Sequence, residues 1–241
     1  MTVYLVGAGP GDPELLTVRA ARLLAQADVL VHDRLTTRTI LDLAPESALR
    51  IDVGKSAGHA VMTQERINQT LVDHGRTGDC VVRLKGGDPY VFGRGAEEAE
   101  ALLAAGVHFE VVPGISSAIA APMAAGVPVT VRNRALAFTV LTGHEDPTSD
   151  STVDWEAHAA TGATLVILMG VGRIAIIAKR LMVGGLNPDT PVAAVHWGCT
   201  DRQHISRTTL SEVGHTELSA PCTIVVGEVA GLDLRSAPRP A

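Results

Sequence analysis

The sequence predicts an α/β protein with two α/β domains. Short apolar segments rich in Val, Leu and Ile alternate with amphipathic segments along the 241 residues. Alternation of this kind predicts mostly parallel strands with helices on the faces of the sheet. The pattern pauses near residues 127–134 and then resumes. We therefore expect an N-terminal domain over residues 1–133, a C-terminal domain over residues 134–231, and a disordered tail over the proline-containing residues 232–241.

The first domain is expected to contain five strands and four helices. The strands are short apolar segments at residues 3–6, 29–31, 48–53, 80–84 and 108–112. Thr17 is placed to cap the first helix, which carries four apolar residues on one face: Ala20, Leu23, Leu24 and Ala27. Two further helices are expected at residues 64–74 and 96–105, and an apolar helix is expected after residues 113–117.

The second domain is expected to contain five strands and a helix. The strands lie at residues 138–142, 164–169, 192–196, 203–208 and 222–226, and the helix at residues 174–183. The polar residues 145–154 are expected to form a mobile loop.

Composition excludes several classes of protein. With 46% hydrophobic and 19% charged residues, the chain can bury a sizeable core and is not expected to be disordered. Its longest apolar runs, such as residues 163–169, are far shorter than the roughly 20 residues of a membrane span. A formal net charge of −6 argues against a non-specific nucleic-acid binder, which needs a basic face.

Cysteine usage and the N-terminus predict a cytoplasmic protein. Cys80, Cys199 and Cys222 are unclustered, which fits a reducing compartment better than a disulfide framework. The chain starts directly with a strand pattern and carries no basic segment typical of a signal peptide. The nine histidines have no metal-ligating spacing, so no metal is expected.

A glycine-rich loop follows the first expected strand, at residues 7–13 (GAGPGDP). Glycines there allow a tight turn and a close approach to a ligand. A dinucleotide site is one interpretation, because Asp33 follows the second strand where a ribose-binding acid would lie. The spacing is G-x-G-x-G, however, and Pro10 and Pro13 interrupt the turn where a helix should begin. A purely structural turn is the other interpretation.

Three later segments also follow strands and are candidates for a ligand site. Residues 83–89 (RLKGGDP) place two adjacent glycines at a strand end, where open α/β sheets bind ligands. Arg94 lies between two glycines and can bind a carboxylate through two hydrogen bonds. Glu97 and Glu98 could instead simply favour the first turn of a helix. Ser116 or Ser117 could cap the next helix or help its free amides bind a polar group.

Taken together, these segments resemble the tetrapyrrole methylase family, and within it the enzymes that methylate uroporphyrinogen III. The matching stretches run in family order from residue 3 to residue 229. They include VYLVGAGPGDPELLT (3–17), ADVLVHDRL (27–35), DVGKSAGH (52–59), VVRLKGGDPYVFGRGAEE (81–98), FEVVPGISSAIAAPMAAGVPVT (109–130), LTGHE (141–145), TLVILMGV (164–171) and IVVGEV (224–229). The opening motif marks the broad family, whereas GGDPxVFGRGxEE with the upstream VGKxxGH is more specific.

The resemblance implies a cofactor, a partner and site residues. S-adenosylmethionine would bind in a cleft between two α/β domains of a homodimer and leave as S-adenosylhomocysteine. The implied cofactor contacts are Pro10, Gly86, Gly87, Asp88, Val91, Ser116, Ser117, Met169 and Gly198. Asp33 would accept a proton and Lys55 would donate one, while Arg94 and Glu97 would face the substrate. Two successive methylations would give precorrin-2 through precorrin-1, for cobalamin or sirohaem synthesis.

Four residues depart from the family pattern. His32 and Leu168 replace more usual tyrosines. Val131 lies between Thr130 and Arg132, where the family more often has the sequence Thr-His-Arg. His196 begins a segment that more often starts with an acidic residue. The departures concern the lining of the substrate pocket and leave the cofactor loops unchanged.

Three alternatives remain open from the residues alone. The chain could methylate a later corrin-ring intermediate, which the GRGxEE run disfavours. It could be an NAD-linked oxidoreductase, which the broken glycine fingerprint disfavours. It could also be a tetrapyrrole carrier without catalytic activity, which would bind ligand without transferring a methyl group.

Overall fold

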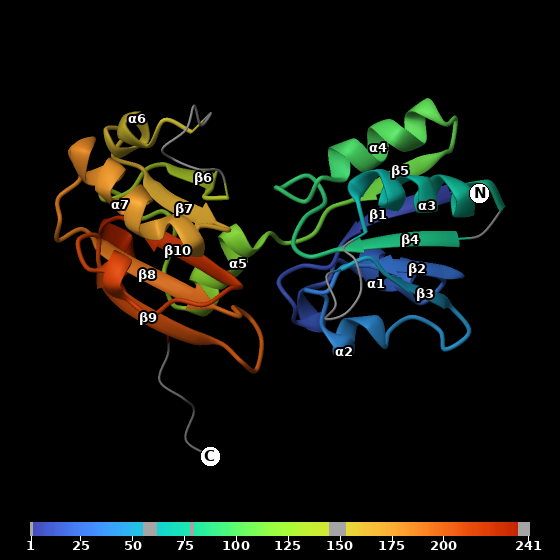
Figure 1. The fold of residues 1–241 in the computed structure, drawn as a ribbon. Coiled ribbons are helices and arrows are strands. Elements are labelled where there is room, and N and C mark those ends of the chain that lie inside the picture. The colour runs from blue at the N-terminus through green and yellow to red at the C-terminus, as the bar shows by residue number, and fades with distance from the viewer. Residues whose placement is uncertain (1, 55–61, 78–79, 145–152, 236–241) are drawn as a thin grey trace, which may run out of the picture. The chain divides into compact units, whose positions relative to one another are not determined.

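The computed structural model describes residues 2–54, 62–77, 80–144 and 153–235, which form two compact units, Met1–Ser116 and Ser117–Ala241 (Figure 1). Each unit has its own five-stranded sheet. Within the described residues, no helix has both the length and the apolar character that a membrane span requires.

The first unit is built on a parallel sheet with the strand order β3-β2-β4-β1-β5. Its strands are β1 (Thr2–Gly7), β2 (Val29–His32), β3 (Leu49–Asp52), β4 (Cys80–Lys85) and β5 (Phe109–Val112). Parallel strands need long crossover connections, and helices supply most of them here. The predicted strands and their parallel pairing are therefore confirmed in this unit.

Helices cover both faces of this sheet (Figure 1). One face carries α1 (Val18–Leu24) and α2 (Arg38–Leu41), and the other carries α3 (Gln64–Thr77) and α4 (Gly95–Ala104). Alternate strand residues point to opposite faces, so Leu30 packs toward α1 and Val31 toward α3. The predicted cap is confirmed, because Thr17 Oγ1 accepts a hydrogen bond from the Ala20 amide at 3.1 Å.

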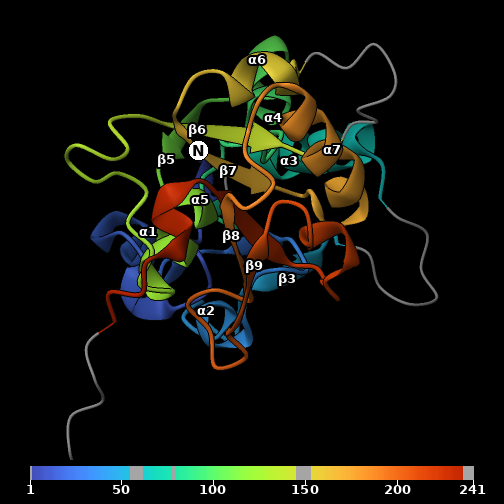
Figure 2. The same cartoon turned by 90° about the vertical axis from the view of Figure 1, so that its left-hand side faces the viewer.

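The second unit contains a mixed sheet with the order β6-β7-β10-β8-β9. The strands are β6 (Phe138–Thr142), β7 (Thr164–Leu168), β8 (Pro191–His196), β9 (His204–Thr209) and β10 (Cys222–Val226). Among the strands that the structure describes in this unit, only β6 and β7 pair in parallel, so mostly parallel pairing is wrong here. The connection from β8 to β9 is too short for a crossover, and these strands form an antiparallel hairpin (Figure 2).

The helices of the second unit also lie on both faces of its sheet. The first face packs against α6 (Trp155–Ala159) and α7 (Ile174–Val183), through side chains that include Trp155 and Ile177. The second face packs against α5 (Ser117–Ala124), whose Ala121 contacts Val195 and Val225. Short 3-10 turns at Pro13–Leu15, Val171–Arg173, Val213–His215 and Glu228–Gly231 complete the two units.

The division between the units lies earlier than the predicted boundary at residue 133. Helix α5 packs on the second sheet, so residues 117–133 belong with the C-terminal unit rather than the N-terminal one. Part of the predicted tail is described, and the Leu234 amide donates a hydrogen bond to the Gly126 carbonyl at 2.9 Å. Residues 236–241 and most of the predicted loop at residues 145–154 lie outside the described residues.

Candidate active site

The loops after β1, β2, β4 and β5 meet at one edge of the first sheet, because all its strands run the same way. The chain leaves β1 toward the face that carries α1, and it leaves β4 toward the face that carries α4. β1 and β4 are neighbours, so these two connections diverge between them. Open α/β sheets bind ligands where adjacent connections diverge in this way.

Glycines bring three of these loops into direct backbone contact. A Cβ atom on Gly114 would lie 2.2 Å from the Gly87 carbonyl oxygen, and one on Gly7 would lie 2.5 Å from the Gly114 Cα. The Gly87 amide donates to the Gly9 carbonyl at 2.7 Å, and the Gly9 amide donates to the Gly87 carbonyl at 3.1 Å. Both residues have φ of +67°, which favours glycine. Side chains would separate these loops.

Asp88 fixes the loop that follows β4. Its Oδ2 accepts a hydrogen bond from the Gly114 amide at 3.1 Å, and its Oδ1 accepts one from the Tyr90 amide at 2.8 Å. The five residues of this unit's strand-end loops that the resemblance assigns to the cofactor therefore lie on connected backbone: Pro10, Gly86, Gly87, Asp88 and Val91. Gly86 and Val91 are exposed at this edge, and the other three are half-buried.

The predicted cofactor residues of the second unit also gather at a sheet edge. β7 and β8 both run antiparallel to β10, so Met169 and Gly198 follow strands that end at the same edge. Met169 is half-exposed and has φ of +56°. Ser117 starts α5 immediately after Ser116, and the next residue, Ala118, packs against Leu168.

Arg94 and Glu97 form an ion pair at the start of α4. Arg94 Nε and Nη2 lie 2.8 and 2.7 Å from the two carboxylate oxygens of Glu97. Hydrogen bonding to Arg94 lowers the pKa of Glu97, and the same contact raises the pKa of Arg94. Both side chains are about half-exposed, so both can reach a ligand in solvent.

The loop around Arg94 is held in an uncommon backbone conformation. Arg94 has φ of +58°, and a Cβ on Gly95 would lie 2.4 Å from the Pro89 carbonyl oxygen. A non-glycine residue at positive φ is strained and is found mainly where the surroundings impose it. The two glycines beside Arg94 therefore pack tightly on the preceding loop.

Asp33 lies at the end of β2 and pairs with a buried arginine. Arg83 Nη2 lies 2.6 Å from Asp33 Oδ1, and Arg83 Nε lies 3.0 Å from Glu98 Oε1. Lys85 Nζ donates to the same Glu98 oxygen at 2.8 Å. Burial is the largest influence on the Arg83 guanidinium and opposes its charge, but Asp33 and Glu98 together raise its pKa. Burial lowers the pKa of Lys85, and the neighbouring charge of Arg83 lowers it further.

Sequence reasoning missed this buried network. The sequence places Arg83 and Lys85 in a turn motif and Glu98 in the first turn of a helix, and neither motif by itself indicates that the three residues meet. Two cations at alternate positions of an apolar strand lie on the same face of the sheet, which indicates a buried anionic partner. The alternate spacing of Arg83 and Lys85 was therefore the feature of the sequence that could have indicated the network.

Two of the departures from the family pattern lie in packed regions. Leu168 is buried against α5, and His196 is fully buried, with its Nδ1 2.8 Å from the Ser219 carbonyl oxygen. The His196 ring stacks on the ring of His204 with centroids 4.1 Å apart. His32 is half-buried beside Asp33. Lys55, the predicted proton donor, lies outside the described residues.

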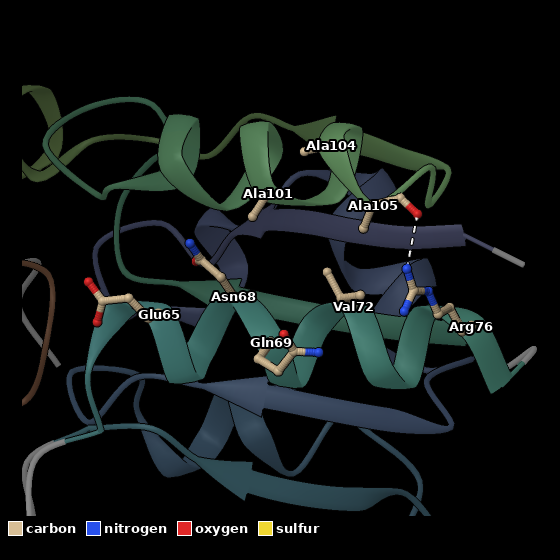
Figure 3. A pocket seen from close by; sticks show the side chains of 8 residues that line it. All are labelled: Glu65, Asn68, Gln69, Val72, Arg76, Ala101, Ala104 and Ala105. Carbon is tan, nitrogen blue, oxygen red and sulfur yellow. Dashed lines mark hydrogen bonds between the residues drawn. The ribbon is translucent and has the colours of Figure 1, made fainter.

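A hollow of about 430 Å³ lies between α3 and α4, away from these loops (Figure 3). Its lining includes Gln69, Val72 and Ala101, and Arg76 donates to the Ala105 carbonyl at its rim. The lining contains none of the predicted site residues. Across the described part of the chain, no three His, Cys, Asp or Glu side chains are grouped so that they could hold a metal ion.

Comparison with known families now identifies the kind of protein. A family model described as Tetrapyrrole (Corrin/Porphyrin) Methylases matches residues 2–214. The chain belongs to the tetrapyrrole methylase family. The strand-end loops described above are therefore those of a tetrapyrrole methylase, and an NAD-linked oxidoreductase is not favoured.

Individual members of the family cover nearly the whole chain. The S-adenosyl-L-methionine-dependent uroporphyrinogen III methyltransferase of Methanosarcina barkeri is 52% identical over 235 residues, which are 95% of this chain and 92% of that protein. A crystal structure of uroporphyrin-III C-methyl transferase from Thermus thermophilus, complexed with S-adenyl homocysteine, is 42% identical, with a TM-score of 0.83. The match covers 96% of this chain and 94% of that one.

A third relative is a longer protein. The siroheme synthase of Edwardsiella ictaluri is 48% identical over 232 residues, which are 95% of this chain but 50% of that protein. The chain thus spans about half the length of this relative.

Proposed function

We propose that this tetrapyrrole methylase transfers methyl groups from S-adenosylmethionine to two carbons of uroporphyrinogen III, giving precorrin-2 through precorrin-1. The observation that carries the proposal is the 52% identity to a uroporphyrinogen III methyltransferase over nearly the full length of both proteins. The exposed pair Arg94 and Glu97 belongs to the motif that distinguishes this branch of the family, and the glycines on either side of Arg94 pack on the loop after β4.

The glycine loops fit the binding of S-adenosylmethionine. Gly7 and Gly114 leave no room for a Cβ atom and Gly87 has a positive φ, so bare backbone stands at the edge where a ligand would approach. Pro10, Gly86, Asp88 and Val91 on those loops would hold the cofactor, together with Ser116, Ser117, Met169 and Gly198. The bound cofactor supplies an electrophilic methyl group on sulfur, so the main task of the protein is alignment and exclusion of water.

Asp33 and Glu97 are the carboxylates that we assign to proton removal or charge stabilisation. The reduced tetrapyrrole attacks as an electron-rich carbon and becomes cationic, so it must then lose a proton. A carboxylate near the ring can stabilise that charge or accept the proton. Asp33 is one third exposed in its side chain and is held by Arg83. Lys55 is the proposed proton donor.

Arg94 is the proposed anchor for a substrate carboxylate. Uroporphyrinogen carries eight carboxylates, whereas the chain has a formal net charge of −6, so long-range attraction does not favour binding. Glu97 occupies the Nε–Nη2 edge of the guanidinium. A guanidinium also has an Nη1–Nη2 edge, which can donate two hydrogen bonds to a carboxylate of the substrate.

We further propose a cytoplasmic homodimer. All three cysteines are free thiols, which fits a reducing compartment. The homodimer follows from the family resemblance, and measurement of the mass in solution by light scattering tests it. A monomer at working concentration would contradict this part of the proposal.

Anaerobic incubation of the protein with uroporphyrinogen III and excess S-adenosylmethionine tests the reaction. We expect two molecules of S-adenosylhomocysteine for each uroporphyrinogen III consumed. Turnover of a later corrin-ring precursor, with no consumption of uroporphyrinogen III, would instead identify a related methyltransferase. Binding of tetrapyrrole without release of S-adenosylhomocysteine would identify a carrier.

A further inference from the structure

Four charged side chains form a nearly dry network behind the strand-end loops of the first unit. Arg83 and Lys85 are each 2% exposed, and Glu98 is fully buried. Asp33 is the member of the network with substantial exposure, because a third of its side chain is accessible. The two positive and two negative charges balance, and Asp33 is the end of the network that a ligand can reach.

The contacts fix the orientation of the Arg83 guanidinium. Its Nη2 donates to Asp33 Oδ1 at 2.6 Å, its Nε donates to Glu98 Oε1 at 3.0 Å, and its Nη1 donates to the Leu84 carbonyl at 3.2 Å. Lys85 donates to the same Glu98 oxygen from another direction at 2.8 Å. Each nitrogen of the planar guanidinium therefore has a partner.

Stability alone does not account for this network. Buried ion pairs lose hydration, and apolar side chains of similar volume often stabilise a core at least as well. Glu98 Oε2 is also buried without a hydrogen-bond partner among the described residues, which adds a further desolvation cost. A network of this cost is more readily understood if it serves the exposed carboxylate at its end.

We propose that Arg83 is a positioning residue that holds the Asp33 carboxylate in place, and that Glu98 and Lys85 hold Arg83. The inference rests on the proposed function, in which Asp33 accepts a proton. With Oδ1 held by Arg83, the proton goes to Oδ2. The methylated ring carbon already bears a carboxylate side chain and becomes quaternary, so the C–H bond that breaks is on the neighbouring methylene bridge, and its electron pair neutralises the cationic ring. Arg83 does not touch the substrate and acts only through Asp33.

A double-mutant cycle between Arg83→Lys and Asp33→Asn tests this inference. A single ammonium group cannot reproduce the three-way contact of the guanidinium. In the wild-type background, Arg83→Lys is expected to lower kcat about tenfold or more, because a misplaced catalytic group is costly. In the Asp33→Asn background the same change is expected to lower kcat less than about twofold, because its target is already lost. The Kd for S-adenosylhomocysteine is expected to stay within about twofold throughout.

Arg180→Lys is the matched control. Arg180 also makes a two-bond ion pair, with Glu156 at 2.8 and 2.6 Å, but it joins α6 and α7 of the second unit. We expect this variant to leave kcat unchanged in both backgrounds. If Arg83→Lys does not give folded protein, Glu98→Gln keeps the side-chain shape while removing the charge that holds Arg83. It enters the same cycle with the same expected coupling.

The outcomes separate the two proposals. If the wild-type protein does not methylate uroporphyrinogen III, the proposed function fails and this inference fails with it. If the wild-type protein is active but the losses from Arg83→Lys and Asp33→Asn multiply, only the positioning role is overturned. Loss of cofactor affinity in proportion to kcat would likewise indicate a merely structural network.

Discussion

At the scale of single residues, the exposed pair Arg94 and Glu97 differs from the buried pair Arg83 and Glu98. Each pair joins an arginine to a glutamate in the first turn of α4, but the Arg94 pair faces solvent and the Arg83 pair is enclosed. Exposed ion pairs contribute little to stability, with typical values of about 0–1 kcal/mol. The Arg94 pair is therefore better explained by ligand contact than by stability.

Arg94→Lys is expected to weaken productive use of the substrate about tenfold or more. Once bound substrate covers the exposed Arg94 side chain, a two-bond contact between guanidinium and carboxylate contributes roughly 1.5–3 kcal/mol, and about 1.4 kcal/mol corresponds to one decade of affinity. Lysine cannot form the planar fork. Steady-state kinetics measures the effect as kcat/KM, and the affinity for S-adenosylhomocysteine should change less than about twofold. Wild-type kinetics in this variant would contradict the assignment.

Asp33→Asn is expected to reduce turnover far more than cofactor affinity. The amide retains the size of the side chain but cannot accept the proton, and it leaves Arg83 with one fewer anionic partner. We therefore expect a fall in kcat with little change in the calorimetric Kd for S-adenosylhomocysteine. The alternative is that Asp33 has a purely structural role in its loop. Equal losses of kcat and of cofactor binding would support that alternative.

At the scale of elements, the glycine contacts decide how closely the loops after β1, β4 and β5 approach one another. Gly7 and Gly114 approach each other and the Gly87 carbonyl at distances that exclude a Cβ atom on either of them. Gly9 and Gly87 exchange backbone hydrogen bonds across the loops, and the Gly114 amide donates to the Asp88 carboxylate. The edge of the sheet is thus shaped by backbone, and its geometry is sensitive to single methyl groups.

Gly114→Ala is expected to destabilise the protein and to weaken cofactor binding together. The added Cβ would lie 2.2 Å from the Gly87 carbonyl oxygen, so the two loops must separate. Overpacking typically costs about 1–3 kcal/mol. Gly172→Ala is the control, because its Cβ would meet nothing within 4 Å. Thermal unfolding and calorimetry measure both effects, and a Gly114→Ala protein that matches the control would show that the close contact is unimportant.

The sequence predicted most elements because their signals are local. The apolar runs of β1, β2 and β4 and the Thr17 cap of α1 depend on neighbouring residues only. The short helices α2 and α6 were not predicted, since one helical turn carries too little periodicity. α5 was assigned to the wrong unit, because an apolar helix does not reveal in sequence which of two sheets it will cover.

The sequence predicted those parts of the candidate site that carry a local motif. The glycine loops and the Arg94 segment carry local motifs, and the structure brings those of the first unit to one sheet edge. The network of Arg83, Lys85 and Glu98 joins a strand to a helix that starts ten residues later, and its members read individually as ordinary surface charges. Only the tertiary packing reveals that they are buried together.

At the scale of the whole molecule, the fold consists of two units with separate cores. The all-parallel first sheet and the mixed second sheet each carry loops with predicted cofactor residues at one edge. The acidic character of the chain, with a formal net charge of −6, means that affinity for an acidic tetrapyrrole must come from local cations.

The preference for S-adenosylmethionine over NAD(P) depends on residues of both units in the proposal. The proposal gives residues of both units to the cofactor, so we expect S-adenosylmethionine and S-adenosylhomocysteine to bind with Kd values on the order of micromolar, about −8 kcal/mol. NAD(P) should bind far more weakly, because the loop after β1 lacks the dinucleotide spacing. Isothermal calorimetry with S-adenosylmethionine, S-adenosylhomocysteine, NAD and NADP gives the order of affinities. Tighter binding of NAD or NADP would refute the cofactor assignment.

The central claim is that the protein adds two methyl groups to uroporphyrinogen III, and the mass of the product tests it most directly. Uroporphyrinogen III is incubated anaerobically with S-adenosylmethionine that carries an isotopically labelled methyl group, and the product is analysed by mass spectrometry. With excess donor, we predict a tetrapyrrole that contains two labelled methyl groups, and a singly labelled intermediate when the donor is limiting. A product that stops at one methyl group under excess donor, or a tetrapyrrole of unchanged mass, would contradict the account.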